Sequence, residues 1–117
     1  MMLPSSPVQV YLAAGVTDMR KAINGLSILV EEQLDLDPLS GHFFCFCNRK
    51  RDIIKILYWD RNGYCLWVKR LEEHRFQWPE TAEEIITIES HKLTWLLDGL
   101  SLHQSDAHER LSYEKMT

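Results

Sequence analysis

The chain lacks the composition of several protein classes. It has 5 Gly and 4 Pro among 117 residues, too few for a collagenous or low-complexity chain, and its 45% hydrophobic content argues against disorder. No apolar run is long enough to cross a bilayer, and residues 1–7 have neither the basic start nor the apolar stretch of a signal peptide. We therefore expect a soluble, cytoplasmic protein with no membrane partner.

Cysteine is scarce and odd in number, with 3 residues, which argues against a disulfide framework. Cys45, Cys47 and Cys65 lie in apolar, strand-like segments, so we interpret them as reduced, buried thiols. Zinc ligands usually begin as a pair on a turn, whereas Cys45 and Cys47 would share one face of a strand. We thus expect no metal and no cofactor.

Motifs of known catalytic chemistry are absent as well. The chain has no Gly-rich phosphate loop, no His-Glu-x-x-His and no Cys-x-x-Cys sequence. Its carboxylates fall mainly at predicted helix caps and solvent-facing positions, which gives no marked pair for two metal ions. We therefore expect a protein that is not an enzyme.

The length of the chain and the distribution of its charge indicate domain number and partners. A chain of 117 residues fits one domain, which we place at residues 1–102 and expect to be followed by a polar, flexible tail at 103–117. The net charge of −4 is unevenly divided, because residues 42–79 carry 8 Lys or Arg against 4 Asp or Glu and both flanking segments are acidic. Such asymmetry bears on binding partners rather than on fold.

The first part of the chain predicts a strand followed by a helix. Val8 to Ala13 is β-branched and aromatic enough for a strand, and the segment from Gly15 to Asp18 supplies a turn and a helix N-cap. Apolar residues then recur at helical spacing as far as Leu34, which predicts an amphipathic helix of about four turns.

Three strands are predicted next, over residues 42–48, 53–60 and 64–71. Asn62-Gly63 between the second and third is typical of a type I′ β-hairpin. The segment Phe43 to Cys47 is apolar at every position, which predicts a central strand covered on both faces, with the helix on one of them.

The last part of the chain predicts two short strands and a helix. Phe76 to Trp78 alternates with polar residues and ends at Pro79; residues 84–89 combine acidic and β-branched side chains, and we favour strand there. Ser90 then caps a short helix that runs through Asp98. The predicted fold is a single α+β domain: a curved, mainly antiparallel sheet of about five or six strands with one long N-terminal and one short C-terminal helix.

Basic residues concentrate in the predicted turn Arg49-Lys50-Arg51 and continue along the strands at Lys55, Lys69 and Arg70, interleaved with tyrosine and tryptophan. Cations neutralise phosphates, and exposed aromatic rings stack on unpaired bases, so the pattern indicates nucleic-acid contact. Alternatively, the turn is simply solvated, the aromatic rings belong to the core and the lysine stems lie along the sheet. The residues by themselves leave both interpretations open.

Arg20 and Lys21 form a second basic group, at the predicted start of the helix. Backbone N–H groups at a helix N-terminus together with cations make a site for an anion such as phosphate. In the alternative interpretation Asp18 offsets the helix dipole and Arg20 pairs with an acidic neighbour.

Several sequence motifs occur together over residues 8–102. They include Val10-Tyr11-Leu12-Ala13, Gly15-Val16-Thr17-Asp18-Met19-Arg20-Lys21, Ser40-Gly41-His42, Arg51-Asp52, Trp59-Asp60, Lys69-Arg70-Leu71-Glu72, Trp78-Pro79 and Leu96-Leu97-Asp98-Gly99. In combination they resemble the TnpB-type accessory proteins of the insertion-sequence-66 family of bacterial transposable elements.

This resemblance implies a non-catalytic protein that is encoded beside a transposase and assists movement of the element. It implies DNA at the element ends and the transposase as partners, and it leaves a homo-oligomer open. The residues expected at DNA are cations in or beside the matched motifs: Arg20, Lys21, Arg49, Lys50, Arg51, Lys55, Lys69 and Arg70. The alternative is a protein adaptor that binds the transposase without touching DNA, for which the acidic ends of the chain are suited.

Overall fold

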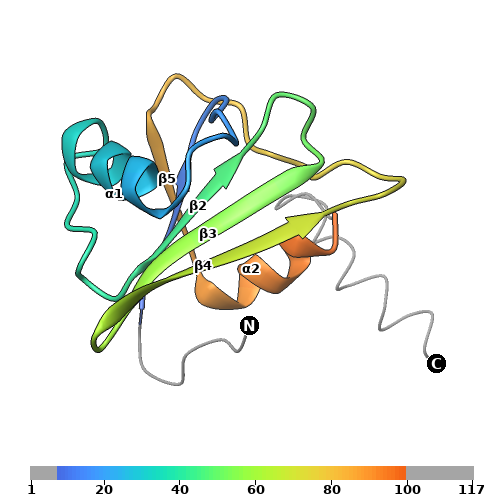
Figure 1. The fold of residues 1–117 in the computed structure, drawn as a ribbon. Helices are drawn as coiled ribbons and strands as arrows, with labels where there is room; N and C mark the ends of the chain where they lie inside the picture. Colours follow the sequence, from blue (N-terminus) through green and yellow to red (C-terminus); the bar gives the residue numbers. More distant parts are fainter. Residues whose placement is uncertain (1–7, 100–117) are drawn as a thin grey trace.

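The strands form one mixed sheet in the order β4-β3-β2-β1-β5, within the residues 8–99 that the computed structural model describes (Figure 1). The elements in chain order are β1 (Val10–Ala13), α1 (Ile23–Glu32), β2 (Phe43–Cys47), β3 (Ile53–Asp60), β4 (Gly63–Arg70), β5 (Ile85–Ile88) and α2 (Ser90–Leu97). β1 and β2 are parallel, and the other neighbouring strands are antiparallel. This confirms the α+β class of a small single domain with two helices.

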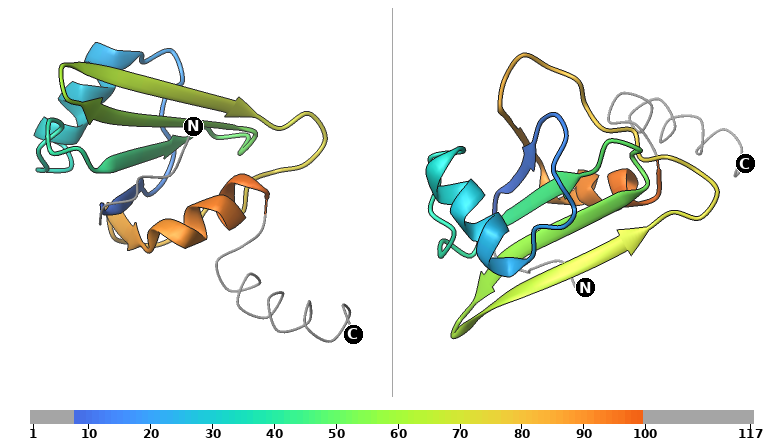
Figure 2. Two further views of the ribbon diagram at one scale, coloured as in Figure 1. Left: turned by 90° about the horizontal axis from the view of Figure 1, so that it is seen from below. Right: turned by 45° about the horizontal axis from the view of Figure 1, so that its top comes forward.

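β2 is the central strand, and all of its side chains are buried. Successive side chains point to opposite faces, so Phe43, Cys45 and Cys47 pack in the cluster that includes α2, whereas Phe44 and Phe46 pack against α1. The two helices accordingly lie on opposite faces of the sheet (Figure 2, left). The predicted central strand with a helix on one face is confirmed, and α2 covers the other.

Burial changes the acidity of the two core thiols. Desolvation raises the pKa of Cys45 far above its usual range and raises that of Cys47 to about 11. Cys65 is half-buried, and all three cysteines are free thiols. Cys45 and Cys47 thus act as small apolar residues of the core.

Helix α1 is shorter than the sequence predicted, with 10 residues. It begins at Ile23 and not after Asp18, because the Asp18 carboxylate accepts hydrogen bonds from the backbone and side chain of Arg20 and forms a separate turn. It ends at Glu32, since Asp35 has a φ of 55° and leaves the helical region. The prediction of a long N-terminal helix is therefore wrong, although the buried Leu26 and Val30 follow the predicted periodicity.

The prediction of a strand over Phe76–Trp78 is also wrong. Both side chains are buried, but the backbone of Phe76 donates to the carbonyl of Arg51 at 2.7 Å, and the Trp78 indole donates to the carbonyl of Ala13 at 3.1 Å. The segment is an anchored loop in which alternate burial imitates the pattern of a strand. β5 confirms the strand predicted over residues 84–89, and α2 confirms the short C-terminal helix.

β3 and β4 form the predicted antiparallel hairpin, with Asp60 opposite Gly63. Its turn is not type I′, which requires positive φ at both central residues, because of these two only Arg61 has positive φ, 52°. No helix of the described segment has the length and apolar character needed to span a membrane. The predicted tail at 103–117 lies outside the described residues.

Candidate nucleic-acid interface

The carboxyl ends of the parallel strands β1 and β2 meet at one edge of the sheet, where ligands of open α/β sheets usually bind. The connection after β1 is tied to this edge by the Thr17 N–H, which donates to the carbonyl of Cys47 at 2.9 Å. The Lys55 ammonium group, on β3, holds the same connection by donating to the carbonyls of Met19 at 2.8 Å and Lys21 at 2.9 Å. These bonds place Arg20 and Lys21, the second basic group of the sequence, next to the turn that follows β2.

An open groove of about 680 Å³ runs along this edge. We call it the basic groove; it is lined by Val16, Thr17, Asp18, Met19, Asn48, Arg49, Lys50, Asp52, Ile53 and Arg70. The connection after β1, the turn after β2 and the end of β4 thus contribute to one surface. Three of the eight predicted DNA-contacting cations line the groove directly, and Arg20 joins them through its bond to Asp18.

The turn between β2 and β3 presents Arg49 and Lys50 at its tip. Asn48 builds the turn, since its side-chain oxygen accepts the N–H groups of Asp52 and Ile53, each at 3.1 Å, and its amide nitrogen donates to the Asp52 carboxylate at 2.7 Å. The hydrogen bond from the Asn48 side-chain amide is the main reason why the pKa of Asp52 lies below its usual range. Arg49 and Lys50 are exposed and make no hydrogen bond or ion pair with the described residues, so their charges face solvent.

Arg70 lines the groove and Arg20 bonds the lining residue Asp18, and each of these arginines has a carboxylate partner close in sequence. Arg20 bonds Asp18 at 2.6 Å and its side chain is 92% exposed; Arg70 bonds Glu72 at 3.0 Å. The hydrogen bonds from Arg20 lower the pKa of Asp18 to about 2. Exposed ion pairs contribute little to stability, and both guanidinium groups can therefore exchange a carboxylate for a phosphate at small cost.

Arg51 is separated from its two neighbours in the turn. It has a φ of 61° and its side chain is half-buried, donating to the carbonyl of Trp78 at 3.3 Å and to the carboxylate of Glu80 at 2.6 Å. It fastens the connection between β4 and β5 to the sheet.

Lys55 and Lys69 likewise bond to backbone. Lys69 donates to the carbonyl of Leu97 at 2.8 Å, at the C-terminus of α2, where a cation also complements the helix dipole. Lys21 is exposed before the start of α1, and its stem lies beside Gly25. Among the eight predicted cations, Arg51, Lys55 and Lys69 thus have structural partners, and the other five are exposed.

The aromatic residues do not gather with these cations. Trp78 is buried, Tyr58 packs on Phe43 at a centroid distance of 4.7 Å, and Trp59 packs on Tyr64 at 5.1 Å beside the β3–β4 turn. Trp67 is half-buried against the core cluster that includes α2. The basic groove therefore offers charge and a few aliphatic side chains, but no lining aromatic ring.

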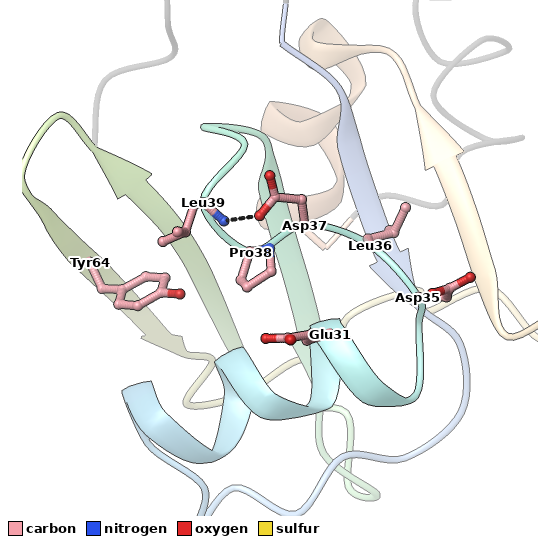
Figure 3. Close-up of a pocket in the computed structure, with 7 residues that line it drawn as sticks. All are labelled: Glu31, Asp35, Leu36, Asp37, Pro38, Leu39 and Tyr64. Carbon is pink, nitrogen blue, oxygen red and sulfur yellow. Dashed lines mark hydrogen bonds between the residues drawn. The ribbon is translucent and has the colours of Figure 1, made fainter.

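A second groove, which sequence reasoning missed, lies at the C-terminus of α1 (Figure 3). We call it the acidic groove; its volume is about 450 Å³, and it is lined by Glu31, Asp35, Leu36, Asp37, Pro38, Leu39 and Tyr64. The run of acidic residues from Glu31 to Asp37 is visible in the sequence. The participation of Tyr64 from β4 is not, because it depends on how α1 packs over the sheet.

Comparison with known proteins agrees with the motifs. A family model described as IS66 Orf2 like protein matches residues 8–107. Two uncharacterized proteins of Sinorhizobium fredii (strain NBRC 101917 / NGR234) are similar: y4hO is 41% identical over 100 residues, covering 85% of this chain and 87% of the relative. The second, y4jC, is 31% identical over 97 residues and covers 83% of each. No solved structure matches the chain.

The family model covers all of the described residues and therefore both grooves. This match confirms the resemblance to the accessory proteins of insertion-sequence-66 elements that the motifs indicated. The chain belongs to the family of IS66 Orf2-like proteins.

Proposed function

We propose that the protein is a non-catalytic accessory factor for DNA transposition and that it contacts the DNA of the element ends through the basic groove. The observation that carries this proposal is the turn after β2, which presents Arg49 and Lys50 to solvent with no hydrogen bond or ion pair of their side chains to residues 8–99. Family membership supplies the context of an insertion element. Arg70, which lines the groove, and Arg20, which bonds the lining residue Asp18, add positive charge to this surface.

The groove favours contact with the phosphate backbone over contact with bases. Cations that neutralise phosphates release counterions, which gives affinity without sequence preference. Stacking on unpaired bases needs exposed aromatic rings, and none lines the basic groove. Asp18 and Asp52 oppose an anion in the groove, so they limit nonspecific affinity for DNA.

We propose the transposase of the same element as the protein partner. We also propose that the protein acts in the cytoplasm. A pure adaptor that never touches DNA is the second candidate, and the acidic groove favours it because an uncompensated negative surface suits a basic protein. The two candidates differ in a single requirement, direct contact between this chain and DNA.

Titration of a fluorescent element-end duplex at several salt concentrations tests DNA contact. Replacing the groove cations in the triple variant Arg49→Ala/Lys50→Ala/Arg70→Ala should weaken binding about 100-fold at low salt and reduce the salt slope by about 3. Arg49→Ala by itself should also weaken binding, and Arg61→Ala is its matched control, because the Arg61 side chain is 91% exposed in the turn at the other end of β3.

Equal affinity and salt slope for the wild type and the triple variant would contradict the proposal. If the wild type does not bind the duplex and yet retains the transposase after nuclease treatment, the adaptor is correct. A cleavage assay with several divalent metal ions should give no product, and metal-dependent cleavage would exclude a non-catalytic role.

A further inference from the structure

The acidic groove has an apolar floor between α1 and the start of β4. Pro38 is buried and Leu36 is half-buried, while Leu39 is 53% exposed at the rim. The Tyr64 ring reaches toward Pro38 from β4, and Glu31 approaches from the helix (Figure 3). The groove can therefore accept one aliphatic side chain of a partner against Leu39 and Tyr64.

The carboxylates around this floor have no cationic partner. Within residues 8–99, the side chains of Glu31, Asp35 and Asp37 make no ion pair, and their one side-chain hydrogen bond is that of the Asp37 carboxylate, which accepts the N–H of Leu39 at 2.9 Å. Three carboxylates without local compensation therefore line the groove beside its apolar floor. A partner that supplies cations would meet complementary charge there.

The position of these charges conflicts with the stability of α1. The C-terminal end of a helix dipole is negative and favours cations, yet the last turn of α1 has no basic residue and contains Glu31 and Glu32. Its first turn, where carboxylates would be favourable, has none. Local arrangements that oppose stability are expected at functional surfaces, so the acids are better explained by a binding partner than by the fold.

We propose that the acidic groove is a docking site for a basic segment of another protein, which places one aliphatic side chain against Leu39 and Tyr64 and its lysines and arginines around Glu31, Asp35 and Asp37. The docking surface lies at the opposite end of β2 from the basic groove, so a docked partner leaves the DNA-contacting residues exposed. This inference does not require the proposed contact with DNA.

Fluorescence anisotropy with a short labelled peptide tests the docking site without DNA. The probe alternates arginine and serine around one central leucine, and a second peptide carries alanine in place of that leucine. The leucine peptide should bind about tenfold more tightly than the alanine peptide, because only leucine fills the apolar floor. Equal binding of the two peptides would show general charge attraction and would overturn the proposal.

Two matched variants locate the binding. Glu31→Gln/Asp35→Asn removes two groove charges and should weaken binding of the leucine peptide about tenfold at low salt. Glu83→Gln/Glu84→Gln removes the same charge from exposed residues before β5 and should leave affinity unchanged. If both variants weaken binding equally, the groove is not the site.

Leu39→Ala should abolish the preference for leucine, with Val16→Ala, at the basic groove, as the control.

A second copy of this chain is the other occupant to consider, since its own basic groove carries cations. Sedimentation equilibrium of the full chain distinguishes the two. A monomer that binds the leucine peptide agrees with the proposal, whereas self-association that Glu31→Gln/Asp35→Asn abolishes would replace the foreign partner with a second copy. Unchanged DNA affinity of this variant would keep the result separate from the test of the basic groove.

Discussion

The basic groove and the acidic groove lie at opposite ends of β2 and β4, and they differ in how their charges are held. Tyr64 and Arg70, which line the acidic and the basic groove, are separated by about 20 Å along β4. Some cations at the basic end face solvent, such as Lys50, and others bond to backbone carbonyls, such as Lys55. The rim carboxylates at the acidic end have no cationic partner among the described residues.

The difference shows that charge density in a sequence does not by itself identify a binding surface. A cation whose ammonium group already bonds two carbonyls, as in Lys55, is less available to a phosphate, because those two bonds must first be broken. A carboxylate without a partner, by contrast, retains its full charge for a ligand. Four variants test this difference between the two ends, in order of decreasing effect.

Trp78→Ala should have the largest effect. Trp78 is buried and anchors the connection between β4 and β5 to the carbonyl of Ala13, so its truncation should lower the free energy of unfolding by about 4 kcal/mol. Denaturant unfolding measures this change. Trp78→Phe keeps most of the packing and should cost less than half as much. Leu39→Ala, at the exposed rim of the acidic groove, should cost about 0.5 kcal/mol or less. A similar loss for Leu39→Ala would mean that the acidic end is structural as well.

Lys55→Met and Lys50→Met separate structural from solvent-facing cations. Lys55→Met removes the two bonds to the carbonyls of Met19 and Lys21 and should destabilise the protein by about 2 kcal/mol. Lys50→Met should change stability by about 0.5 kcal/mol at most. Unfolding in urea at equal ionic strength compares the two variants. Equal stability would remove the distinction between the two kinds of cation.

Glu31→Lys should stabilise the protein. A cation in the last turn of α1 interacts favourably with the helix dipole, which Glu31 opposes, and we expect a gain of about 0.5 kcal/mol at low salt. Thermal unfolding with and without added salt measures the gain and its screening. Glu83→Lys makes the same charge change outside any helix and should have no effect. Destabilisation by Glu31→Lys would show that the acids at this end support the fold.

Arg20→Ala should have the smallest effect on stability at neutral pH and a distinct effect on titration. The pKa of Asp18 is about 2 because Arg20 donates hydrogen bonds to the carboxylate, and in the variant it should return toward the usual 3.8. The lowered pKa contributes stability that is present above about pH 4 and is lost as pH falls toward 2. Carboxyl-carbon NMR titration of Asp18 measures both values. A wild-type pKa near 4 would show that the Arg20 pair does not persist in solution.

The sequence predicted the elements whose signals are local. Three of these predictions are confirmed: the strand β2 at Phe43–Cys47, the strand β5 before Ser90, and the antiparallel pair β3–β4 on either side of residues 61–62. The sequence pattern was misleading where a side chain packs or bonds differently from the way its local spacing indicates. Asp18 has the chemistry of an N-cap but bonds Arg20, and Phe76 and Trp78 alternate like a strand but pack as a loop.

The candidate site could be predicted only in part for the same reason. The sequence located the basic turn Arg49-Lys50-Arg51, because three consecutive cations are visible without a fold. It could not show that Arg51 turns back to Trp78 and Glu80 while its neighbours face solvent. The sequence also has aromatic residues next to the cations, whereas in the structure these rings pack in the core or on one another and none lines the basic groove.

Family membership, fold class, a central strand covered on both faces and a basic middle segment were thus determined by the sequence itself, since each depends on residue type and short-range spacing. Tertiary structure alone decided which cations remain available and created the acidic groove from α1, the segment that follows it and Tyr64. The physical reason is that a charge is available only when no nearby carbonyl or carboxylate satisfies it. Those neighbours come from parts of the chain that folding, not sequence order, brings together.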